Sequence, residues 1–391
     1  MSTESRNWDG AEFPYRRTFA PVDLSALRHN LAALRAALPE GVRFCAVVKA
    51  DAYGHGFAGM AEVFSEYADC YAVAAVSEGI ELRRVPALEK APILILGDVD
   101  EGEYGDLLSY GLTASVSSLS EAEALSALSV REGKTAHIHI ALDTGMSRIG
   151  LPADEDGIRE LALISKLPGI SIDGIFTHFA TADETDKART EQQAERFRTF
   201  LNRADALCID TGIRHTANSA AILEGIGLQY DMVRGGIAMY GLYPSDEVKK
   251  EISLLPVMQL KARITHVKEI APGTEVSYGG IFRAEKRMLV GTVSAGYADG
   301  YPRNVSGKGM EVLVRGRRCP VLGRVCMDQL MIGLDGVPEA KKGDIVTLFG
   351  TDGDACIPLE ELAKKSGGFH YELLCGVNKR VPRVYFGGQK A

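Results

Sequence analysis

The chain has 391 residues, of which 46% are hydrophobic and 25% are charged, as in ordinary soluble globular proteins. Its formal net charge of -8 argues against a nucleic-acid partner, because phosphate binding needs a basic face. No apolar run approaches the roughly 18 residues of a membrane span, and the polar start "MSTESRNWDG" lacks the pattern of a signal peptide. We therefore expect a cytoplasmic protein without a membrane partner.

Short β-rich segments alternate with helical patterns through the first two thirds of the chain, after a first helical pattern at 23–38. The predicted strands are 43–48, 70–76, 92–96, 112–118, 136–142, 171–180, 214–221 and 231–241. Helical patterns follow at 57–68, 77–85, 100–111, 120–130, 156–167, 186–207 and 222–226. Strands that alternate with helices form a parallel sheet, and this number of units predicts an α/β fold of the (β/α)8 barrel type. A doubly wound sheet is the main alternative, but no G-x-G-x-x-G follows the first strand.

The sequence pattern changes after the eighth predicted strand. Short alternating segments, separated by Gly and Pro, occur at 258–270, 287–295, 310–316, 318–326, 329–334 and 344–349. This spacing predicts a smaller, mainly β domain. We therefore expect a barrel domain over 1–250 and a C-terminal β domain over 251–391.

Seven cysteines are present, at irregular spacing and without a C-x-x-C pair. Their odd number and spacing predict neither a disulfide framework nor a metal site. We expect most of them to be small buried hydrophobic residues in a reducing compartment.

Polar residues end several of the predicted barrel strands, which is where the active sites of such barrels lie. Each residue alone has an ordinary explanation, such as a solvated loop lysine, a structural histidine, a helix cap or a flexible turn. In the barrel they would meet on one face: Lys49, Arg148, His178, Asn218, Ser219, Arg234 and Gly236.

The positions of these residues indicate a phosphorylated aldehyde as cofactor. Barrels often bind phosphate with the loops after strands seven and eight, which here carry Ser219, Gly236 and Ile237. A lysine at the end of a core strand, such as Lys49, is a suitable amine for an imine. Pyridoxal 5'-phosphate fits this set, with Arg234 available for the ring nitrogen.

At this point the chain resembles the alanine racemases, which are pyridoxal-phosphate enzymes of fold type III. The resemblance rests on blocks in the same order, among them "AVVKADAYGHG", "DTGMSRIG", "GIFTHFA", "HTANSAA", "DMVRGGIAMYG", "VSYGG", "GYADGY", "GRVCMDQ" and "YELLCGVNKRVPRVY". It extends from about residue 17 to 386. It implies a barrel followed by a β domain, and a homodimer with shared active sites that interconverts L- and D-alanine for peptidoglycan.

The resemblance also implies a role for each matching residue. Lys49 would hold the cofactor and act as one base, and Tyr278 of the partner subunit would be the other. Two bases are required because racemisation removes a proton from one face of the α-carbon and returns one to the opposite face. Arg234 would face the pyridine nitrogen, with His215 supporting it.

The remaining implied roles concern binding and access. The phosphate would be held by Tyr53, Ser219, Gly236, Ile237 and Tyr371, and the rest of the cofactor would contact Arg148, His178 and Asn218. Arg148 and Met327 would approach the substrate, whereas Tyr297, Tyr371 and Asp328 would narrow the entrance. The chain departs from many relatives at Ala141, where they carry a carbamylated lysine that pairs with the arginine.

Three other functions fit parts of the sequence. A racemase of broader or different specificity, for serine or lysine, shares all these motifs. A basic amino-acid decarboxylase of the same fold would carry an acidic residue, and not Arg234, at the ring nitrogen. A pyridoxal-phosphate carrier without turnover would resemble the barrel alone and would not need the residues after Pro256.

Overall fold

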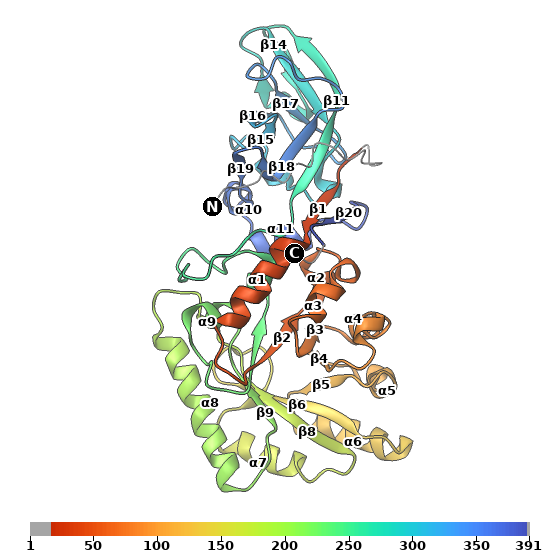
Figure 1. Cartoon of the computed structure of the whole chain (residues 1–391), viewed down its shortest axis with the longest axis vertical. Helices are drawn as coiled ribbons and strands as arrows, with labels where there is room; N and C mark the ends of the chain where they lie inside the picture. Colours follow the sequence, from red (N-terminus) through yellow and green to blue (C-terminus); the bar gives the residue numbers. More distant parts are fainter. Residues whose placement is uncertain (1–16, 389–391) are drawn as a thin grey trace. The chain divides into compact units, whose positions relative to one another are not determined.

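The computed structural model describes residues 17–388, which fall into two compact units (Figure 1). The barrel unit consists of Ser25–Ala52 and Gly56–Leu255. The β unit consists of Pro256 onward, the described residues up to Leu24, and the short segment Tyr53–His55. The polar stretch 1–10 lies outside the described residues.

Eight parallel strands close the barrel, as predicted. They are β2 (Arg43–Val47), β3 (Cys70–Val73), β4 (Ile93–Ile95), β5 (Thr113–Val116), β6 (Ala136–Asp143), β8 (Ile170–Phe176), β9 (Ile213–His215) and β10 (Met232–Gly235). Each strand pairs in parallel with the next, and β10 pairs with β2 to complete the ring. A two-residue strand, β7 (Leu151–Pro152), extends the pairing beside the end of β6. Since the carboxyl ends of parallel strands share one face, the predicted site residues that follow these strands lie at the same end of the barrel.

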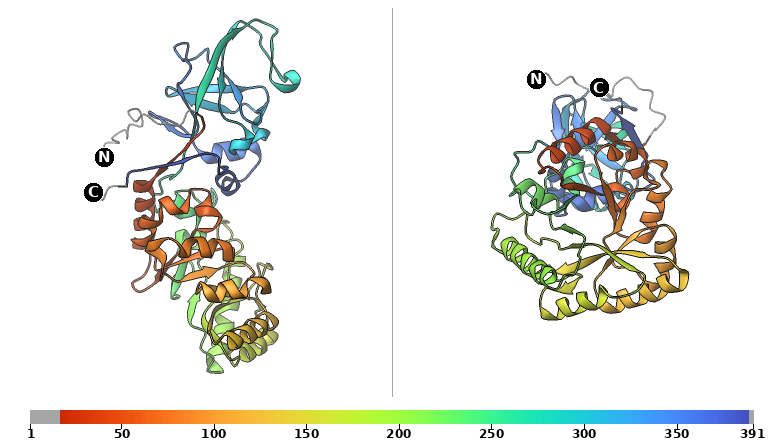
Figure 2. Two further views of the ribbon diagram at one scale, coloured as in Figure 1. Left: turned by 90° about the vertical axis from the view of Figure 1, so that its right-hand side faces the viewer. Right: turned by 60° about the horizontal axis from the view of Figure 1, so that its bottom comes forward.

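Helices surround the strands on the outside of the barrel (Figure 2). They are α1 (Leu24–Ala36), α3 (Ala61–Ser65), α4 (Val76–Arg83), α5 (Tyr104–Ser109), α6 (Leu119–Glu132), α7 (Glu155–Ile164), α8 (Ala188–Ala206) and α9 (Ser219–Glu224). The side chains of Ser118 and Asp154 accept backbone N–H groups at the starts of α6 and α7. The eighth strand is shorter than predicted, because the chain turns at Gly236 into a 3-10 turn over Ile237–Tyr240.

The β unit is built on one seven-stranded sheet, which confirms the predicted mainly β domain. Its order is β11 (Leu260–Ile270), β14 (Met288–Val293), β17 (Leu330–Gly333), β16 (Arg317–Leu322), β15 (Glu311–Val314), β18 (Ile345–Asp352) and β19 (Ala355–Ile357). The pairings are antiparallel, and β11 also pairs with β18, so the sheet curves back on itself. Smaller pieces are the parallel pair β1 (Ala20–Asp23) and β20 (Arg383–Phe386), the hairpin β12 (Glu275–Val276) and β13 (Phe282–Arg283), and helices α10 (Leu359–Ser366) and α11 (His370–Cys375).

Alternating strand residues supply the interior of the β unit. Ile270, Val276, Ala284, Val290 and Leu322 form one buried apolar cluster under the hairpin. Burial of such side chains is the main favourable term in folding, at about 25 cal/mol per Å² of apolar surface. The expectation that most cysteines are buried was wrong, because Cys208, Cys356 and Cys375 are exposed and two more are only partly buried.

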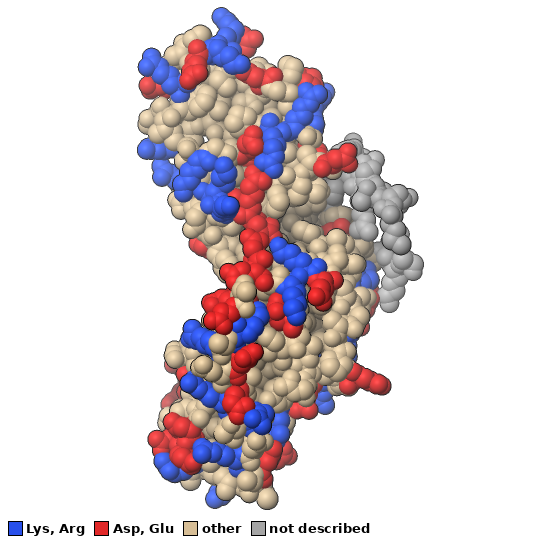
Figure 3. Space-filling view, turned by 90° about the vertical axis from the view of Figure 1, so that its left-hand side faces the viewer, with Lys and Arg blue, Asp and Glu red and all other residues tan. Residues whose placement is uncertain are grey.

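Acidic and basic side chains occur together over both units on the face shown in Figure 3. Within residues 17–388, no helix has the length and apolar character needed to cross a membrane.

Candidate active site

Lys49 lies two residues after the end of the first barrel strand, β2, and the backbone turns left-handed directly after it. Ala50, Asp51 and Ala52 have φ values of 53°, 52° and 55°, so this turn, α2 in Figure 1 (Lys49–Tyr53), is left-handed. Each such residue costs roughly 1–2 kcal/mol relative to a right-handed turn. Lys49 is therefore held at the barrel mouth by strained backbone, as is common at functional sites.

Local hydrogen bonds stabilise this strained turn. The backbone N–H of Ala50 donates to a carboxylate oxygen of Glu78 at 2.6 Å. Asp51 accepts from two later residues: its carbonyl from Gly56 N at 3.0 Å and its side chain from Phe57 N at 2.7 Å. The glycine-rich "YGHG" stretch follows because Gly54 and Gly56 also adopt positive φ. Neither the left-handed turn nor the contact with Glu78 was predicted from the sequence.

Arg234 lies on β10, and among residues 17–388 its hydrogen-bond partners include no carboxylate. Its side chain is 2% exposed and donates to the carbonyls of Thr177 at 2.8 Å, Thr216 at 3.1 Å and His215 at 3.3 Å. NH1, which donates to the His215 carbonyl, also lies 2.8 Å from Nδ1 of His215. Burial lowers the pKa of Arg234 to about 10, so the guanidinium keeps its proton at neutral pH. These acceptors are all neutral, so the positive charge is available to a ligand.

The two predicted site histidines flank this arginine. His215 is fully buried, stacks on Phe176, and has a pKa well below the usual value because of burial and the Arg234 charge. His178 follows β8, with Nδ1 3.4 Å from Arg234 NH2 and Nε2 3.4 Å from the amide of Asn218. Burial lowers the pKa of His178 as well, and the charges of Arg234, Arg148 and Lys49 lower it further. The structure thus brings both histidines, Arg234 and Lys49 into one electrostatic neighbourhood of the barrel.

The loops after β9 and β10 meet at Ser219. Its hydroxyl oxygen accepts from the backbone N–H of Gly236 at 2.8 Å and of Ala238 at 3.3 Å. Asn218 caps helix α9, because its side-chain oxygen accepts from Ala221 N at 3.1 Å. The predicted phosphate-binding residues Ser219, Gly236 and Ile237 are therefore side by side, as the sequence analysis expected.

Arg148 lies on the exposed loop after β6. Asp143 shapes this loop by accepting the backbone N–H groups of Gly145 at 2.8 Å and Ser147 at 3.0 Å. Ser147 has a φ of 58°, which turns the chain just before Arg148. Ala141, at the position where the sequence analysis noted a missing lysine, is buried in β6.

The second group of predicted residues belongs to the β unit. Tyr278 is 70% exposed, Met327 is 53% exposed and Tyr297 is 41% exposed, which is unusual for large apolar side chains. The segments of Tyr297 and Met327 are joined by two backbone bonds, Tyr297 N to Cys326 O and Ala298 N to Met327 O, both 3.0 Å. Tyr53 and Tyr371 are neighbours in this unit, with ring centroids 6.2 Å apart.

A salt bridge that the sequence analysis missed holds the Tyr297 and Met327 segments together. Arg380 donates from Nε to Asp299 at 2.8 Å and from NH2 to Asp328 at 2.8 Å. Asp299 is buried and also accepts the N–H of Gly296 at 2.9 Å. Gly296 is required there, because a Cβ would lie 2.3 Å from the carbonyl oxygens of both Cys326 and Met327.

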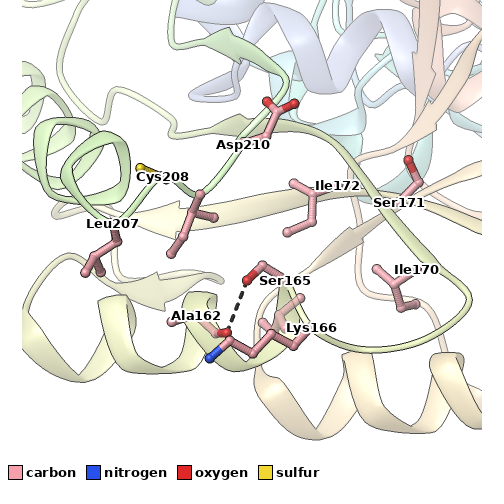
Figure 4. Close-up of a pocket in the computed structure, with 11 residues that line it drawn as sticks. Ala162, Ser165, Lys166, Ile170, Ser171, Ile172, Leu207, Cys208 and Asp210 are labelled. Atoms are coloured by element: carbon pink, nitrogen blue, oxygen red, sulfur yellow. Dashed lines mark hydrogen bonds between the residues drawn. The ribbon is translucent and has the colours of Figure 1, made fainter.

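A surface pocket in the barrel unit lies away from these residues (Figure 4). It lies beside Ile170, at the start of β8, and the residues that lead into β9, Leu207 to Asp210. In Figure 4 the Ser165 hydroxyl donates to Ala162 O at its floor. This is the amino end of the strands, whereas Lys49 follows the carboxyl end of β2, so the pocket is separate from the candidate site.

Known protein families match nearly the whole chain. The family described as "Alanine racemase, N-terminal domain" matches residues 22–244, and "Alanine racemase, C-terminal domain" matches residues 257–385. The chain belongs to the alanine racemase family. Members of this family are isomerases that racemise an amino acid.

Individual members of the alanine racemase family are similar along their full length. The alanine racemase of Desulforamulus reducens is 45% identical over 371 residues, which cover 94% of this chain and 99% of the relative. The solved alanine racemase of Clostridium difficile 630 has a TM-score of 0.89 at 40% identity, covering 94% of this chain and 95% of the other. That of Bacillus anthracis, solved with bound L-Ala-P, has a TM-score of 0.89 at 36% identity and covers 97% of both chains.

Proposed function

We propose that the protein is a homodimeric, pyridoxal-phosphate-dependent racemase that interconverts L-alanine and D-alanine. Lys49 and Tyr278 of the partner subunit serve as the two proton-transferring groups. The observation that carries the proposal is the buried Arg234, which presents a guanidinium with only neutral acceptors in the same neighbourhood as Lys49. In the cell the product D-alanine would serve cytoplasmic synthesis of peptidoglycan precursors.

The residues of the barrel fit pyridoxal phosphate by the chemistry of their donors. Lys49 offers an amine at the barrel mouth, and Arg234 offers a donor for the ring nitrogen. In the loop of Ser219, Gly236 and Ile237, the Ser219 hydroxyl is a donor for a phosphate. The Gly236 N–H donates to the Ser219 oxygen in this structure and would exchange that acceptor for the phosphate. Tyr53 and Tyr371 are the proposed phosphate contacts from the β unit. When bound, the cofactor attaches to an amino group and withdraws electrons from the substrate's α-carbon, which makes its proton acidic.

Two groups on opposite faces of the substrate are needed to move the proton. The Lys49 amine exchanges it on one face, and the phenol of Tyr278 from the partner subunit exchanges it on the other. The exposure of Tyr278, at 70% in the single chain, supports this role, because the side chain is available to a second subunit. Met327 and Arg148 would orient the substrate, while Tyr297, Tyr371 and Asp328 would restrict access to small amino acids.

Arg234 restrains the chemistry to racemisation. A guanidinium donates hydrogen bonds but does not give up its proton at neutral pH, so Arg234 would hold the pyridine nitrogen without protonating it. The bound cofactor would then withdraw electrons more weakly, which would favour return of the proton by Lys49 or Tyr278 over side reactions. The neutral state of His178 and His215 preserves this arrangement, since neither adds a second positive charge beside Arg234.

One assay tests the proposed activity directly. L-Alanine, L-serine and L-lysine are incubated with the protein and pyridoxal phosphate. The decay of the circular dichroism signal of each amino acid is followed. We expect the circular dichroism signal of all active substrates to decay, and we expect alanine to have the highest kcat/KM of the three amino acids. A higher kcat/KM for serine or lysine would replace alanine as the proposed substrate, and release of carbon dioxide from lysine would overturn the proposal.

A further inference from the structure

His139 lies inside the barrel and contacts a histidine two strands away. It belongs to β6, is 6% exposed, and has its Nδ1 2.8 Å from Nε2 of His215 on β9. Strand β8 lies between β6 and β9 in the sheet. The contact therefore passes over β8, and some feature of β8 must leave room for it.

Gly174 and an adjacent bulge provide this room. Ile138 pairs with Ile172 but His139 pairs with Gly174, so Asp173 is an extra residue on β8. A Cβ on Gly174 would lie 2.6 Å from Cε1 and 2.8 Å from Nδ1 of His139. Any residue other than glycine would therefore push the His139 ring away from His215.

Arg234 determines which nitrogens of this chain carry protons. A guanidinium only donates, so Nδ1 of His215, 2.8 Å from Arg234 NH1, must be an acceptor. The proton of His215 is then on Nε2, which donates to Nδ1 of His139. His139 in turn keeps its own proton on Nε2. Arg234 thus fixes the tautomer of His215, and His215 fixes the tautomer of His139.

We propose that His139 is a positioning residue for Arg234, acting through His215 to hold the guanidinium in the orientation that faces the ligand. The catalytic consequence rests on the proposed racemase function, whereas the hydrogen-bond chain itself does not. Without His139, the Nε2–H of buried His215 has no acceptor, and a buried unsatisfied donor is costly. The His215 ring would then turn toward another acceptor and release its contact with Arg234.

The surroundings of the chain support two neutral rings. Burial lowers the pKa of His139 to about 4, against the attraction of the Asp173 carboxylate on β8. That carboxylate is bound on the outer side by His137, whose Nδ1 lies 2.8 Å from it. The remaining charged group beside the chain is Arg234 on β10, which disfavours a second positive charge.

The first test observes the tautomers directly. The full chain is labelled with 15N-histidine, and long-range 1H–15N spectra are recorded for wild type and for His139→Asn and His215→Asn to assign the signals. We expect His139 and His215 both as neutral Nε2–H tautomers at pH 7. Imidazolium, or an Nδ1–H tautomer, at His215 would overturn the proposal, with or without racemase activity.

The second test uses matched variants of the holoenzyme. His139→Leu removes the acceptor, His139→Asn restores one through its side-chain oxygen, and His137→Leu is a control on the same strand with an exposed side chain. We expect His139→Leu to lower kcat about tenfold with little change in KM, and His139→Asn to recover most of this loss. The His137→Leu variant should behave as wild type.

The outcomes separate this inference from the proposed function. Equal losses in His139→Leu and His139→Asn, or none in either, would overturn the positioning role. An inactive wild type with the expected tautomers would overturn the proposed function and leave the hydrogen-bond chain standing. If His139→Leu does not fold, the positioning role is tested by the tautomers of the wild type and by the kcat of His139→Asn, which should stay close to the wild-type kcat.

Discussion

NH1 of Arg234 lies 2.8 Å from Nδ1 of His215, and no carboxylate is among the hydrogen-bond partners found for Arg234 in residues 17–388. An acidic partner would neutralise the guanidinium, whereas imidazole and carbonyl acceptors only orient it. The pair thus delivers a fixed, uncompensated positive charge to the barrel interior. The expected behaviour of several variants follows from this charge and from the residues around it.

Lys49→Ala should abolish covalent attachment of pyridoxal phosphate and lower racemisation at least about 100-fold, because a positioned proton-transfer group is lost. Attachment is measured by borohydride reduction followed by mass spectrometry of the peptide that contains residue 49. Lys166→Ala, at the opposite end of the barrel, is the control. Cofactor fixed to another lysine in the Lys49→Ala variant would show that Lys49 is not the attachment site.

Arg234→Glu should increase transamination relative to racemisation. A carboxylic acid shares its proton with the ring nitrogen, which strengthens electron withdrawal and gives side reactions more time. The ratio is measured as pyruvate formed per racemisation event, with Arg234→Lys as a variant that keeps the positive charge. An unchanged ratio in Arg234→Glu would mean that Arg234 does not control the ring nitrogen.

Lys49→Ala and Tyr278→Phe should complement each other when mixed as subunits. Each homodimer should be nearly inactive, but a shared site in a symmetric dimer leaves one intact site in every heterodimer. Random reassortment makes about half the dimers mixed, so roughly a quarter of wild-type activity should return. No recovery, with subunit exchange verified by mass, would place both residues in sites made by one chain.

His139→Asn should reduce the acid sensitivity of the fold. The folded protein holds the pKa of His139 at about 4, below its ordinary value of 6.5, so the unfolded chain binds more protons between these pH values. Stability from this group is therefore complete above pH 6.5 and is lost as pH falls toward 4. Between pH 7 and pH 5 the wild type should lose about 2 kcal/mol more than the variant.

The measurement is urea unfolding of both proteins at fixed protein concentration, since the stability of a dimer depends on concentration. Titrating groups that do not contact His139 are shared and cancel in the difference, whereas His215, whose pKa His139 helps to lower, contributes to it. Parallel pH profiles for wild type and variant would contradict the depressed pKa of His139.

Arg380→Gln should destabilise the β unit by about 1–3 kcal/mol, because the buried carboxylate of Asp299 loses its hydrogen-bonded cation and, within residues 17–388, keeps only Arg17, at 3.9 Å. Arg198→Gln is a control, since it removes an exposed i,i+3 ion pair with Glu195. Adding Asp299→Asn to Arg380→Gln should cost less than the sum of the two single changes. Additive losses in urea unfolding would show that Arg380 and Asp299 do not act as a pair.

The sequence alone was sufficient to predict the barrel and the strand ends at which candidate residues such as Lys49 lie. Period-2 and period-3.6 hydrophobic patterns report which side of a local segment is buried, so alternating strands and helices could be counted. Parallel strands carry their carboxyl ends to one face, which predicts that Lys49, Ser219 and Arg234 lie at the same end of the barrel. The motif "VSYGG" likewise singled out Tyr278.

Features that depend on strand register or on backbone handedness could not be predicted from the sequence and are seen only in the folded chain. Ala50, Asp51 and Ala52 form a left-handed turn that no local preference predicts, because non-glycine residues avoid it and distant contacts such as Glu78 must hold it. In the sequence, His139 is one polar residue within a predicted strand. In the structure, the bulge at Asp173 and the absence of a side chain at Gly174 allow it to contact His215. Such contacts join segments far apart in the chain, and a periodic pattern carries no information about them.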